Sequence, residues 1–278
     1  MIIWMMTDME GLSGVDQIDQ FSPEKDDSPQ YRYGLDQLTA EANAAIAGCF
    51  DAGATEVRIC DGHGYNGNRG FTADLDPRAK KVHVATRNPI RWDGLDESVH
   101  ALAMIGQHAM AGTVNGYLDH TQSSKVICRY LINGEEAGEM SQMALYAGGV
   151  GAPLFYVSGD EALCAEAARL FPHALSTPTK RGTGWETCDL YPTDDVRANI
   201  RRDIAAALLK VDRSKAWRLP YPIEVAIEWA WTGRADPIAR IPGVRRPHAR
   251  TVAWDISDQR DVFDRPNPSW SPAIIPES

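Results

Sequence analysis

The sequence predicts an α/β fold with a mainly parallel sheet and flanking helices, followed by a smaller α+β C-terminal subdomain. Residues 2–7 form a continuous apolar run, which is typical of a strand buried on both faces of a parallel sheet. A helical pattern at residues 35–52 and a second strand pattern at residues 56–60 follow it. Strand, helix and strand in this order begin a right-handed crossover unit. The later alternation of apolar runs with helical patterns also favours an α/β sheet.

The first helix is predicted from apolar residues that recur at three- and four-residue spacing, and Gly53 stands at its C-terminal end. Further strands are predicted at residues 82–85, 102–105, 126–132 and 154–157, and further helices near residues 138–146 and 161–170. In the last third of the chain we expect a long helix at residues 193–210 and strands at residues 223–230 and 251–255.

The chain has 278 residues, which is enough for one large domain or two moderate ones. We expect an α/β domain at residues 1–180 and an α+β subdomain at residues 181–278, with the change of pattern near residues 176–192. Residues 16–31 are rich in Asp, Gln, Ser and Pro, which predicts an irregular polar loop that serves as a solvated connection or a lid. The Pro-rich residues 265–278 predict an extended tail.

Composition narrows the classes of function. Hydrophobic residues make up 44% and charged residues 24%, the usual balance of a soluble globular protein. Because 28 Lys and Arg face 38 Asp and Glu, the net charge of −10 argues against a nucleic-acid partner. Apolar runs stay well short of the ~20 residues that span a bilayer, and the first residues lack the basic start of a signal peptide. Five cysteines without a CxxC pair predict reduced thiols and a cytoplasmic location.

Two acidic residues stand at the end of the first predicted strand. Side chains alternate along a strand with period two, so Asp8 and Glu10 project to the same side while Met9 points away. Two neighbouring carboxylates repel each other at a buried strand end unless a cation or a proton compensates. Ligands of open α/β sheets bind beyond the carboxyl ends of the strands. The pair is therefore a candidate metal site, although these two residues taken alone fit a solvated acidic turn better.

Two histidines follow other predicted strands. His63 comes directly after the strand at residues 56–60, in the glycine-flanked stretch Asp61-Gly62-His63-Gly64. His108 follows the strand at residues 102–105. Parallel strands end at the same edge of a sheet, so both imidazoles are expected near Asp8. A lone loop histidine is usually a surface residue, but two that converge on paired carboxylates favour metal ligation.

A third carboxylate and a third histidine complete the set of candidates. Glu139 opens a predicted helix, where a carboxylate is also favoured by the helix dipole. Glu135 and Glu136 lie close enough in sequence to compete for the same role, and the pattern does not choose among the three. His120 lies in a polar loop and suits general acid/base or nucleophilic chemistry. Imidazoles mixed with carboxylates suit zinc, with manganese or cobalt as alternatives.

Several short blocks resemble one known family. Residues 8–14 read DMEGLSG, which resembles the DMEGxSG opening of the D-aminopeptidases, zinc metallopeptidases linked to dipeptide-transport operons. Four later blocks agree in order and spacing: EAN at 41–43, DGH at 61–63, GQHA at 106–109 and GE at 138–139. The combination of five blocks is far more specific than any one of them.

The resemblance implies a particular site. Asp8 would bridge two zinc ions, and the other ligands would be Glu10, His63, His108 and Glu139, so that Glu139 is preferred over Glu135 and Glu136. His120 falls where the family has a proposed nucleophilic histidine, although the family's Ser-His-Ser reads Asp119-His120-Thr121 here. Residues 180–185 have no clear counterpart. Residues 1–180 would then be the metal-binding catalytic domain.

The first hypothesis for function is a zinc-dependent aminopeptidase that hydrolyses short peptides with an N-terminal D-residue, such as D-Ala-D-Ala. The resemblance also implies a ring-shaped homo-decamer. A second hypothesis is another two-metal hydrolase, such as an amidase or a phosphoesterase. The phosphoesterase would be expected to add Arg or Lys for phosphate oxygens, and the five blocks contain neither. A third is a non-enzymatic domain whose metal is structural and fully ligated by protein.

Overall fold

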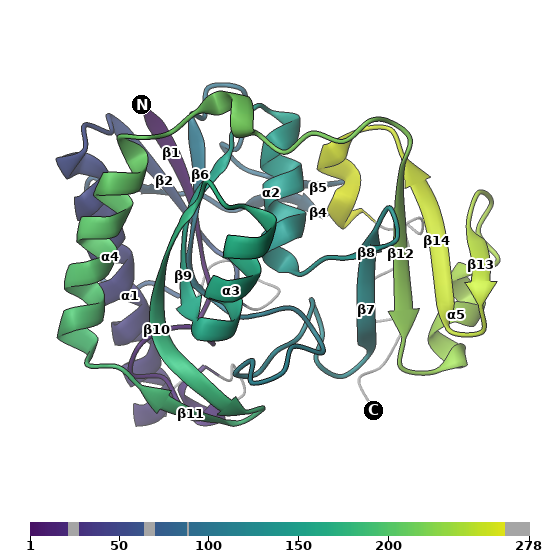
Figure 1. The fold of residues 1–278 in the computed structure, drawn as a ribbon, viewed down its shortest axis with the longest axis horizontal. Helices are drawn as coiled ribbons and strands as arrows, with labels where there is room; N and C mark the ends of the chain where they lie inside the picture. The colour runs from purple at the N-terminus through teal and green to yellow at the C-terminus, as the bar shows by residue number, and fades with distance from the viewer. Residues whose placement is uncertain (22–27, 64–69, 88, 265–278) are drawn as a thin grey trace.

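The computed structural model describes residues 1–21, 28–63, 70–87 and 89–264, and it contains two main sheets (Figure 1). The larger sheet has seven strands in the order β11-β10-β9-β6-β1-β2-β3, and all neighbours are parallel except β10 and β11. Its strands are β1 (Ile2–Thr7), β2 (Glu56–Asp61), β3 (Ala79–Lys81), β6 (Ala101–Gln107), β9 (Leu154–Asp160), β10 (Leu175–Gly184) and β11 (Thr187–Leu190). The predicted α/β fold with a mainly parallel sheet is confirmed.

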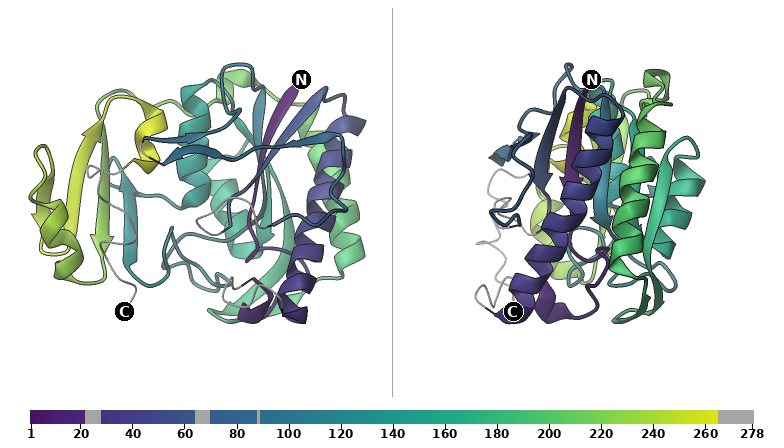
Figure 2. Two further views of the ribbon diagram at one scale, coloured as in Figure 1. Left: turned by 180° about the vertical axis from the view of Figure 1, so that it is seen from behind. Right: turned by 90° about the vertical axis from the view of Figure 1, so that its left-hand side faces the viewer.

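Helices cover both faces of this sheet. Helices α1 (Pro29–Asp51) and α4 (Thr193–Leu208) pack side by side on one face, as two views show (Figures 1 and 2). Helices α2 (Glu139–Gly149) and α3 (Glu161–Leu170) contribute to the core on the other face. The residues of β1 divide accordingly: Ile3 and Met5 belong to the core under α1 and α4, while Trp4 and Met6 belong to the opposite core. Burial on both faces explains the continuous apolar run of this strand.

The first helix begins earlier than its pattern predicted. Ser28 caps it by accepting a hydrogen bond from the backbone N–H of Tyr31, and Pro29 occupies the first helical position, where a missing N–H is harmless. The predicted loop at residues 16–31 therefore contains the start of α1 and a short 3₁₀ helix, η1 (Ile18–Gln20). Residues 22–27 lie outside the described part of the chain, so the lid stays a prediction.

A second, antiparallel sheet packs beside the first. Its order is β13-β14-β12-β7-β8. Its strands are β7 (Ile127–Ile132), β8 (Glu135–Glu136), β12 (Ile223–Trp229), β13 (Arg245–His248) and β14 (Thr251–Ile256). The remaining elements are the hairpin β4 (Val84–Arg87) and β5 (Ile90–Trp92), helix α5 (Thr232–Ile238), and the 3₁₀ helices η3 (Arg213–Lys215) and η4 (Gln259–Phe263).

Sheet membership does not follow the predicted division at residue 180. Strands β7 and β8 come from the first part of the chain but pair with the C-terminal strands, and β10 runs across residue 180 within the larger sheet. The stretch at 176–192, where the change of pattern was predicted, contains most of the hairpin of β10 and β11. The division into residues 1–180 and 181–278 stays a prediction, and the tail at 265–278 lies outside the described residues.

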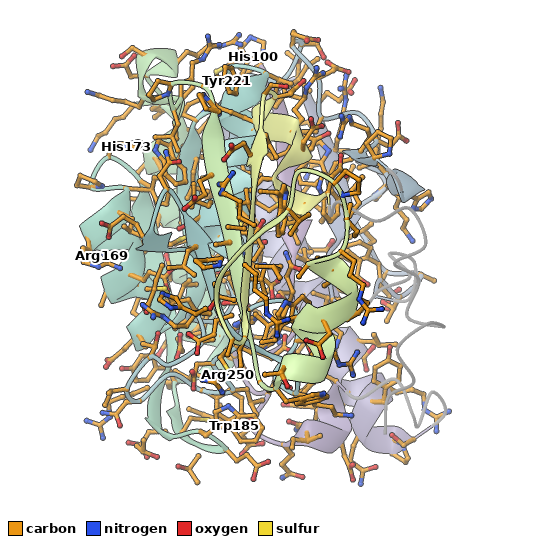
Figure 3. The ribbon with its side chains drawn as sticks, turned by 90° about the vertical axis from the view of Figure 1, so that its right-hand side faces the viewer. His100, Arg169, His173, Trp185, Tyr221 and Arg250 are labelled. Atoms are coloured by element: carbon orange, nitrogen blue, oxygen red, sulfur yellow. The ribbon has the colours of Figure 1, made fainter. Side chains whose placement is uncertain are left out.

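The strand register brings the candidate site together. Thr7, the last residue of β1, pairs with Asp61 in β2 and with Ile105 in β6. The segments that follow these three neighbouring strands therefore emerge at one edge of the sheet. Figure 3 places Trp185, in the β10–β11 turn, at one end of the molecule and His100, which precedes β6, at the other. The site lies at the carboxyl edge, as expected for an open α/β sheet.

Candidate metal centre

The segment after β1 lies directly against the end of β6. The backbone N–H of Asp8 donates to the carbonyl of Ile105, and that of Gly11 donates to the carbonyl of Gly106, both at 2.8 Å. A Cβ atom at Gly11 would lie 1.9 Å from the Gln107 carbonyl oxygen, so only glycine permits this approach. The contact holds Asp8 and Glu10 at the sheet edge, where the two residues are 3% and 6% exposed.

His63 contacts both of these carboxylates. Its Nδ1 lies 3.0 Å from Asp8 Oδ1 and 3.2 Å from Glu10 Oε2, and its Nε2 lies 2.9 Å from the carbonyl oxygen of Phe21. The backbone N–H of His63 donates to Asp61 Oδ1 at 3.0 Å, which fixes the turn. Because Nε2 can donate to a carbonyl, Nδ1 is the nitrogen available to a metal, in the arrangement typical of ligating histidines.

His108 carries the clearest sign of a missing ligand. Its Nδ1 donates to the Ala109 carbonyl at 3.0 Å, which leaves a lone pair on Nε2. This Nε2 is buried and has no hydrogen-bond partner among the residues that the structure describes. It lies 3.6 Å from Asp8 Oδ2 and 3.7 Å from Glu139 Oε1. A buried acceptor between two carboxylates fits a divalent cation. Without a partner, the nitrogen would lose its solvation in water with no interaction to compensate.

Glu139 is the member of the acidic trio that reaches the cluster. It is the first residue of α2, and its Oε1 accepts a 2.6 Å hydrogen bond from the backbone N–H of Gln122. Glu135 and Glu136 form the exposed strand β8, where Glu136 pairs with Arg129. The structure thus places Glu139 at the site and the other two away from it.

His120 stacks on His108. The ring centroids are 3.9 Å apart with an interplanar angle of 13°. His120 Nδ1 donates to the Leu118 carbonyl at 2.8 Å, so Nε2 faces the cluster, 3.8 Å from Glu139 Oε1. This geometry permits proton transfer, but it also permits ligation.

Ligand atoms gather in two overlapping groups. In each, the atoms lie within 4.8 Å of one another: one group comprises Asp8, Glu10 and His108, and the other His108, His120 and Glu139. His63 belongs to neither group, although its Nδ1 contacts the two carboxylates of the first. The structure therefore brings all six predicted residues to one edge of the sheet.

The protonation of the cluster follows from burial and mutual charge. Burial and the neighbouring Glu10 raise the pKa of Asp8 well above its usual value. Burial also acts to raise the pKa of Glu10, but the charge and the hydrogen bond of His63 lead the effects that hold this pKa well below its usual range. For His63, burial disfavours the charged form, yet Glu10 and Asp8 raise its pKa well above its usual value. Burial and like charge thus oppose the ionisation of neighbouring carboxylates, and positive charge beside them favours it.

Three supporting side chains were not singled out by sequence reasoning. Thr179 and Lys180 of β10 bind the loop that carries Glu10, and so does Glu41 of α1. Glu41 was visible only as part of the EAN block. Lys180 and Thr179 carried no signal, because their polar groups act on backbone carbonyls distant in sequence.

A parallel sheet with clustered carboxylates and imidazoles beyond its strand ends suits a metal-dependent hydrolase. A family model described as D-aminopeptidase (peptidase M55) matches residues 1–265. A D-aminopeptidase of Bacillus subtilis (strain 168) is 28% identical over 266 residues, which cover 95% of this chain and 94% of the relative. A solved structure, described as the zinc-dependent D-aminopeptidase DppA from Bacillus subtilis, a self-compartmentalizing protease, has a TM-score of 0.85 and 26% identity, and the match covers 95% of this chain and 94% of that one.

The chain belongs to the D-aminopeptidase family and is a peptide hydrolase. The resemblance read from the five sequence blocks is confirmed.

Proposed function

We propose that this protein is a zinc-dependent aminopeptidase that hydrolyses short peptides with an N-terminal D-residue, D-Ala-D-Ala among them. The observation that carries the proposal is the buried, unpartnered Nε2 of His108 between Asp8 and Glu139, within the part of the chain that the structure describes. The donor set of carboxylate oxygens and imidazole nitrogens is one that zinc favours, with manganese or cobalt as alternatives. Family membership and the zinc dependence stated for the Bacillus subtilis structure support zinc.

The ligands we propose are Asp8, Glu10, His63, His108 and Glu139. Two ions would share the site, with Asp8 between them, because its Oδ1 faces His63 and its Oδ2 faces His108. Zinc held there would act as a Lewis acid that polarises the scissile carbonyl and activates water. The acidic side chains of the same cluster suit the α-amine of a peptide, which would set the position of the first residue.

We assign proton transfer or direct attack on the carbonyl to His120. Its Nδ1 is engaged by the Leu118 carbonyl, so Nε2 is the atom that would act. Nε2 lies 3.8 Å from Glu139 Oε1, and because both side chains are partly exposed, it would be able to deliver a proton to the leaving amine. Stacking on His108 fixes the plane of the ring and thereby the direction of the transfer.

The alternative hydrolases have less support. A phosphoesterase needs cations for phosphate oxygens. In the described residues, the ion pairs of Asp8, Glu10 and Glu139 are formed with histidines. A purely structural metal would need a closed set of protein ligands. In the proposed ligand set, His120 lies beside the cluster but is not itself a ligand.

We also propose that the protein acts as a homo-oligomer in the cytoplasm. The description of the Bacillus subtilis structure as self-compartmentalizing supports assembly, and the ring-shaped homo-decamer is the form that the family resemblance implies. The five cysteines are all free, in agreement with a reducing compartment. No helix among the described residues combines the length and apolar character needed to cross a bilayer. Light scattering of the purified protein would measure the number of subunits.

The test of the activity is kcat/KM for D-Ala-D-Ala against L-Ala-L-Ala, with zinc supplied and metal content measured by elemental analysis. If ligands hold the α-amine and the carbonyl at two fixed points, inverting the α-carbon misplaces the scissile bond. A misplacement of about 1 Å costs on the order of 100-fold in rate, so we expect a preference of that size for the D-peptide. Equal rates, or a preference for the L-peptide, would remove the D-specific assignment and leave a metal-dependent peptidase.

A further inference from the structure

The loop at residues 10–15 begins with the proposed ligand Glu10. Buried polar side chains form hydrogen bonds with its backbone. These come from two distant elements, β10 and α1. A loop that carries a ligand needs such support, because metal ligands bind tightly only when their backbone is already in place.

Lys180 of β10 holds both ends of this loop. Its side chain is fully buried, and its Nζ donates to the carbonyl of Glu10 at 2.6 Å and to the carbonyl of Val15. The same ammonium lies 4.5 Å from the centroid of the Tyr117 ring, a cation–π contact that helps to replace lost solvation. A fully buried lysine that spends its donors on two backbone carbonyls fixes the distance between them.

A shift in the strand register allows two consecutive residues of β10 to contact the loop at residues 10–15. The pairing of β10 with β9 shifts between Pro178 and Lys180, and as a result Thr179 and Lys180 are both buried although they are consecutive. Thr179 donates its hydroxyl to the carbonyl of Gly11, inside the same loop. Regular alternation would send one of the two side chains to the other face of the sheet. Such irregularities redirect side chains and are common beside active sites.

Glu41 completes the support from the side of α1. Its Oε1 accepts a 2.6 Å hydrogen bond from the backbone N–H of Ser13, and its side chain is fully buried. The loop therefore receives donors on its carbonyls from β10 and an acceptor on its amide from α1.

We propose that Lys180, with Thr179 beside it, is a positioning residue of the metal centre. By holding the carbonyls of Glu10, Gly11 and Val15, the pair keeps the Glu10 carboxylate beside Asp8 and His63 before an ion arrives. This inference rests on the proposed function, in which Glu10 is a ligand and zinc the ion.

Loss of this support is expected to affect one of the two ions more than the other. Glu10 belongs to the ligand group with Asp8 and His108, whereas Glu139 and His120 are held by the backbone of residues 118–122 and by α2. Releasing the loop at residues 10–15 should therefore weaken one of the two ions and leave the other in place. A general loss of protein stability would not discriminate between the two ions.

The experiment is a zinc titration of the metal-free protein against a chromophoric chelator, at a temperature where every variant is folded. Lys180→Met keeps the length of the side chain and removes both donors. We expect one ion to bind with wild-type affinity and the other about 10- to 100-fold more weakly, the range found when an outer partner of a metal ligand is lost. Thr179→Val is nearly isosteric and should weaken the same ion by a smaller factor, which keeps the proposal testable if Lys180→Met does not fold.

The matched control is Thr177→Val, in the same strand. Thr177 is also buried, but its hydroxyl donates to Asp203 and not to the loop at residues 10–15. This variant should retain both zinc affinities. Unchanged affinities in Lys180→Met or Thr179→Val, or an equal weakening of both ions, would overturn the positioning role while leaving the proposed function intact. Failure of the wild-type protein to bind zinc would instead overturn the proposed function.

Discussion

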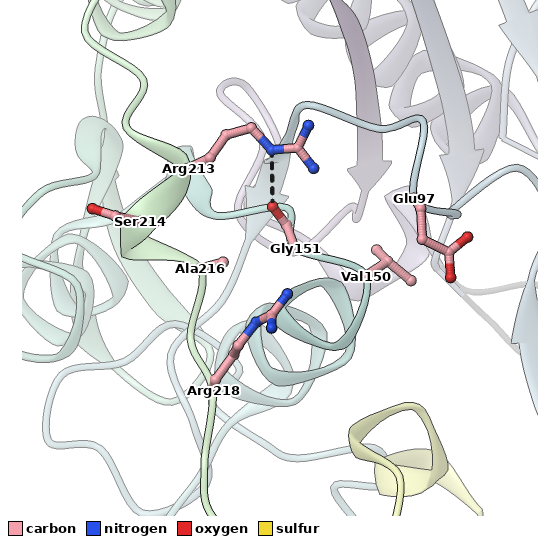
Figure 4. Close-up of a pocket in the computed structure, with 7 residues that line it drawn as sticks. All are labelled: Glu97, Val150, Gly151, Arg213, Ser214, Ala216 and Arg218. Carbon is pink, nitrogen blue, oxygen red and sulfur yellow. Dashed lines mark hydrogen bonds between the residues drawn. The ribbon is translucent and has the colours of Figure 1, made fainter.

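The two ends of the seven-stranded sheet differ in the surroundings of their charged side chains. At the carboxyl end, the carboxylates and imidazoles of the candidate site are packed against one another, with Asp8, Glu10 and His108 no more than 6% exposed. At the amino end, a cavity of about 460 Å³ opens beside the turn after α2 (Figure 4). It is lined by Glu97, Val150, Gly151, Arg213, Ser214, Ala216 and Arg218.

This cavity does not mark the proposed chemistry of the protein. The cavity's Arg213 has a structural role, because its Nε donates to the carbonyl of Gly151, just beyond the last turn of α2, where carbonyls lack helical partners. The cluster at the other end contains a buried atom, His108 Nε2, for which the described chain provides no hydrogen bond and which lies between two carboxylates. The candidate site is distinguished by the carboxylates and the second imidazole that surround this buried nitrogen.

The largest effect is expected at the carboxyl end, from Asp8→Ala. Because its two oxygens face different ligand partners, its loss should release both ions. The fall in kcat/KM should exceed the roughly 100-fold that loss of an outer partner can cause. Elemental analysis and peptide hydrolysis measured on the same sample would check it. Two ions per chain retained in the variant would contradict the bridging role.

The next effect concerns His120→Ala, which separates proton transfer from ligation. If His120 transfers a proton, turnover should fall on the order of 10²- to 10⁴-fold while metal content and thermal stability stay the same. His120 also lies within ligand reach of His108 and Glu139. A parallel loss of metal and rate would therefore move His120 into the ligand set.

A smaller effect, on stability, is expected from Glu41→Gln. Burial raises the pKa of Glu41 from 4.5 to about 7, although its hydrogen bond from Ser13 acts in the opposite direction. Since the folded state favours the protonated carboxyl, its contribution is fully present below pH 4.5 and is lost as the pH rises through about 7. A rise from 4.5 to about 7 corresponds to about 3 kcal/mol.

Denaturant unfolding of the metal-free wild type and of Glu41→Gln, between about pH 5 and about pH 8, would measure this. The variant should gain stability relative to the wild type as the pH rises, up to about 3 kcal/mol, and the gain should level off above about pH 7. A difference in stability that does not depend on pH would show that Glu41 does not titrate in this range.

The smallest effect is expected at the amino end. Arg213→Ala and Arg218→Ala should leave kcat/KM and zinc content unchanged, because the cavity lies at the opposite end of the sheet from the cluster. Loss of the Arg213 hydrogen bond to Gly151 should reduce the free energy of unfolding by about 1 kcal/mol. Steady-state kinetics with denaturant unfolding would test both statements. A large loss of activity in either variant would remove the contrast between the two ends.

Much of the larger sheet could be predicted because its strands are buried on both faces. The apolar runs of β1, β2, β6 and β9 were all visible in the sequence, and so were the helices between them. The hairpin of β10 and β11 was missed, since both strands carry many polar residues and so resemble a loop in the sequence. The membership of β7 in the second sheet was also hidden, because pairing with strands almost 100 residues later has no local signal.

For the site, the sequence by itself determined which residues stand at the ends of neighbouring strands. Asp8, His63 and His108 each follow a predicted strand, and parallel strands end at the same edge, so their convergence followed from topology. The choice of Glu139 over Glu135 and Glu136 came from family resemblance and not from the pattern. The tertiary structure gave a physical reason for it: Glu139 opens α2 beside His108, while the other two lie on an exposed strand.

Only the tertiary structure decided what supports the ligands. Lys180 and Thr179 reach the loop at residues 10–15 because a shift of register turns two consecutive side chains of β10 inward, and the Lys180 contact with Glu10 spans a separation of 170 residues. Local sequence determines which face of a strand a side chain occupies only while the strand is regular. Once the register shifts, the position of a side chain depends on the strands on either side, and a lysine that reads as a surface residue becomes a fully buried one.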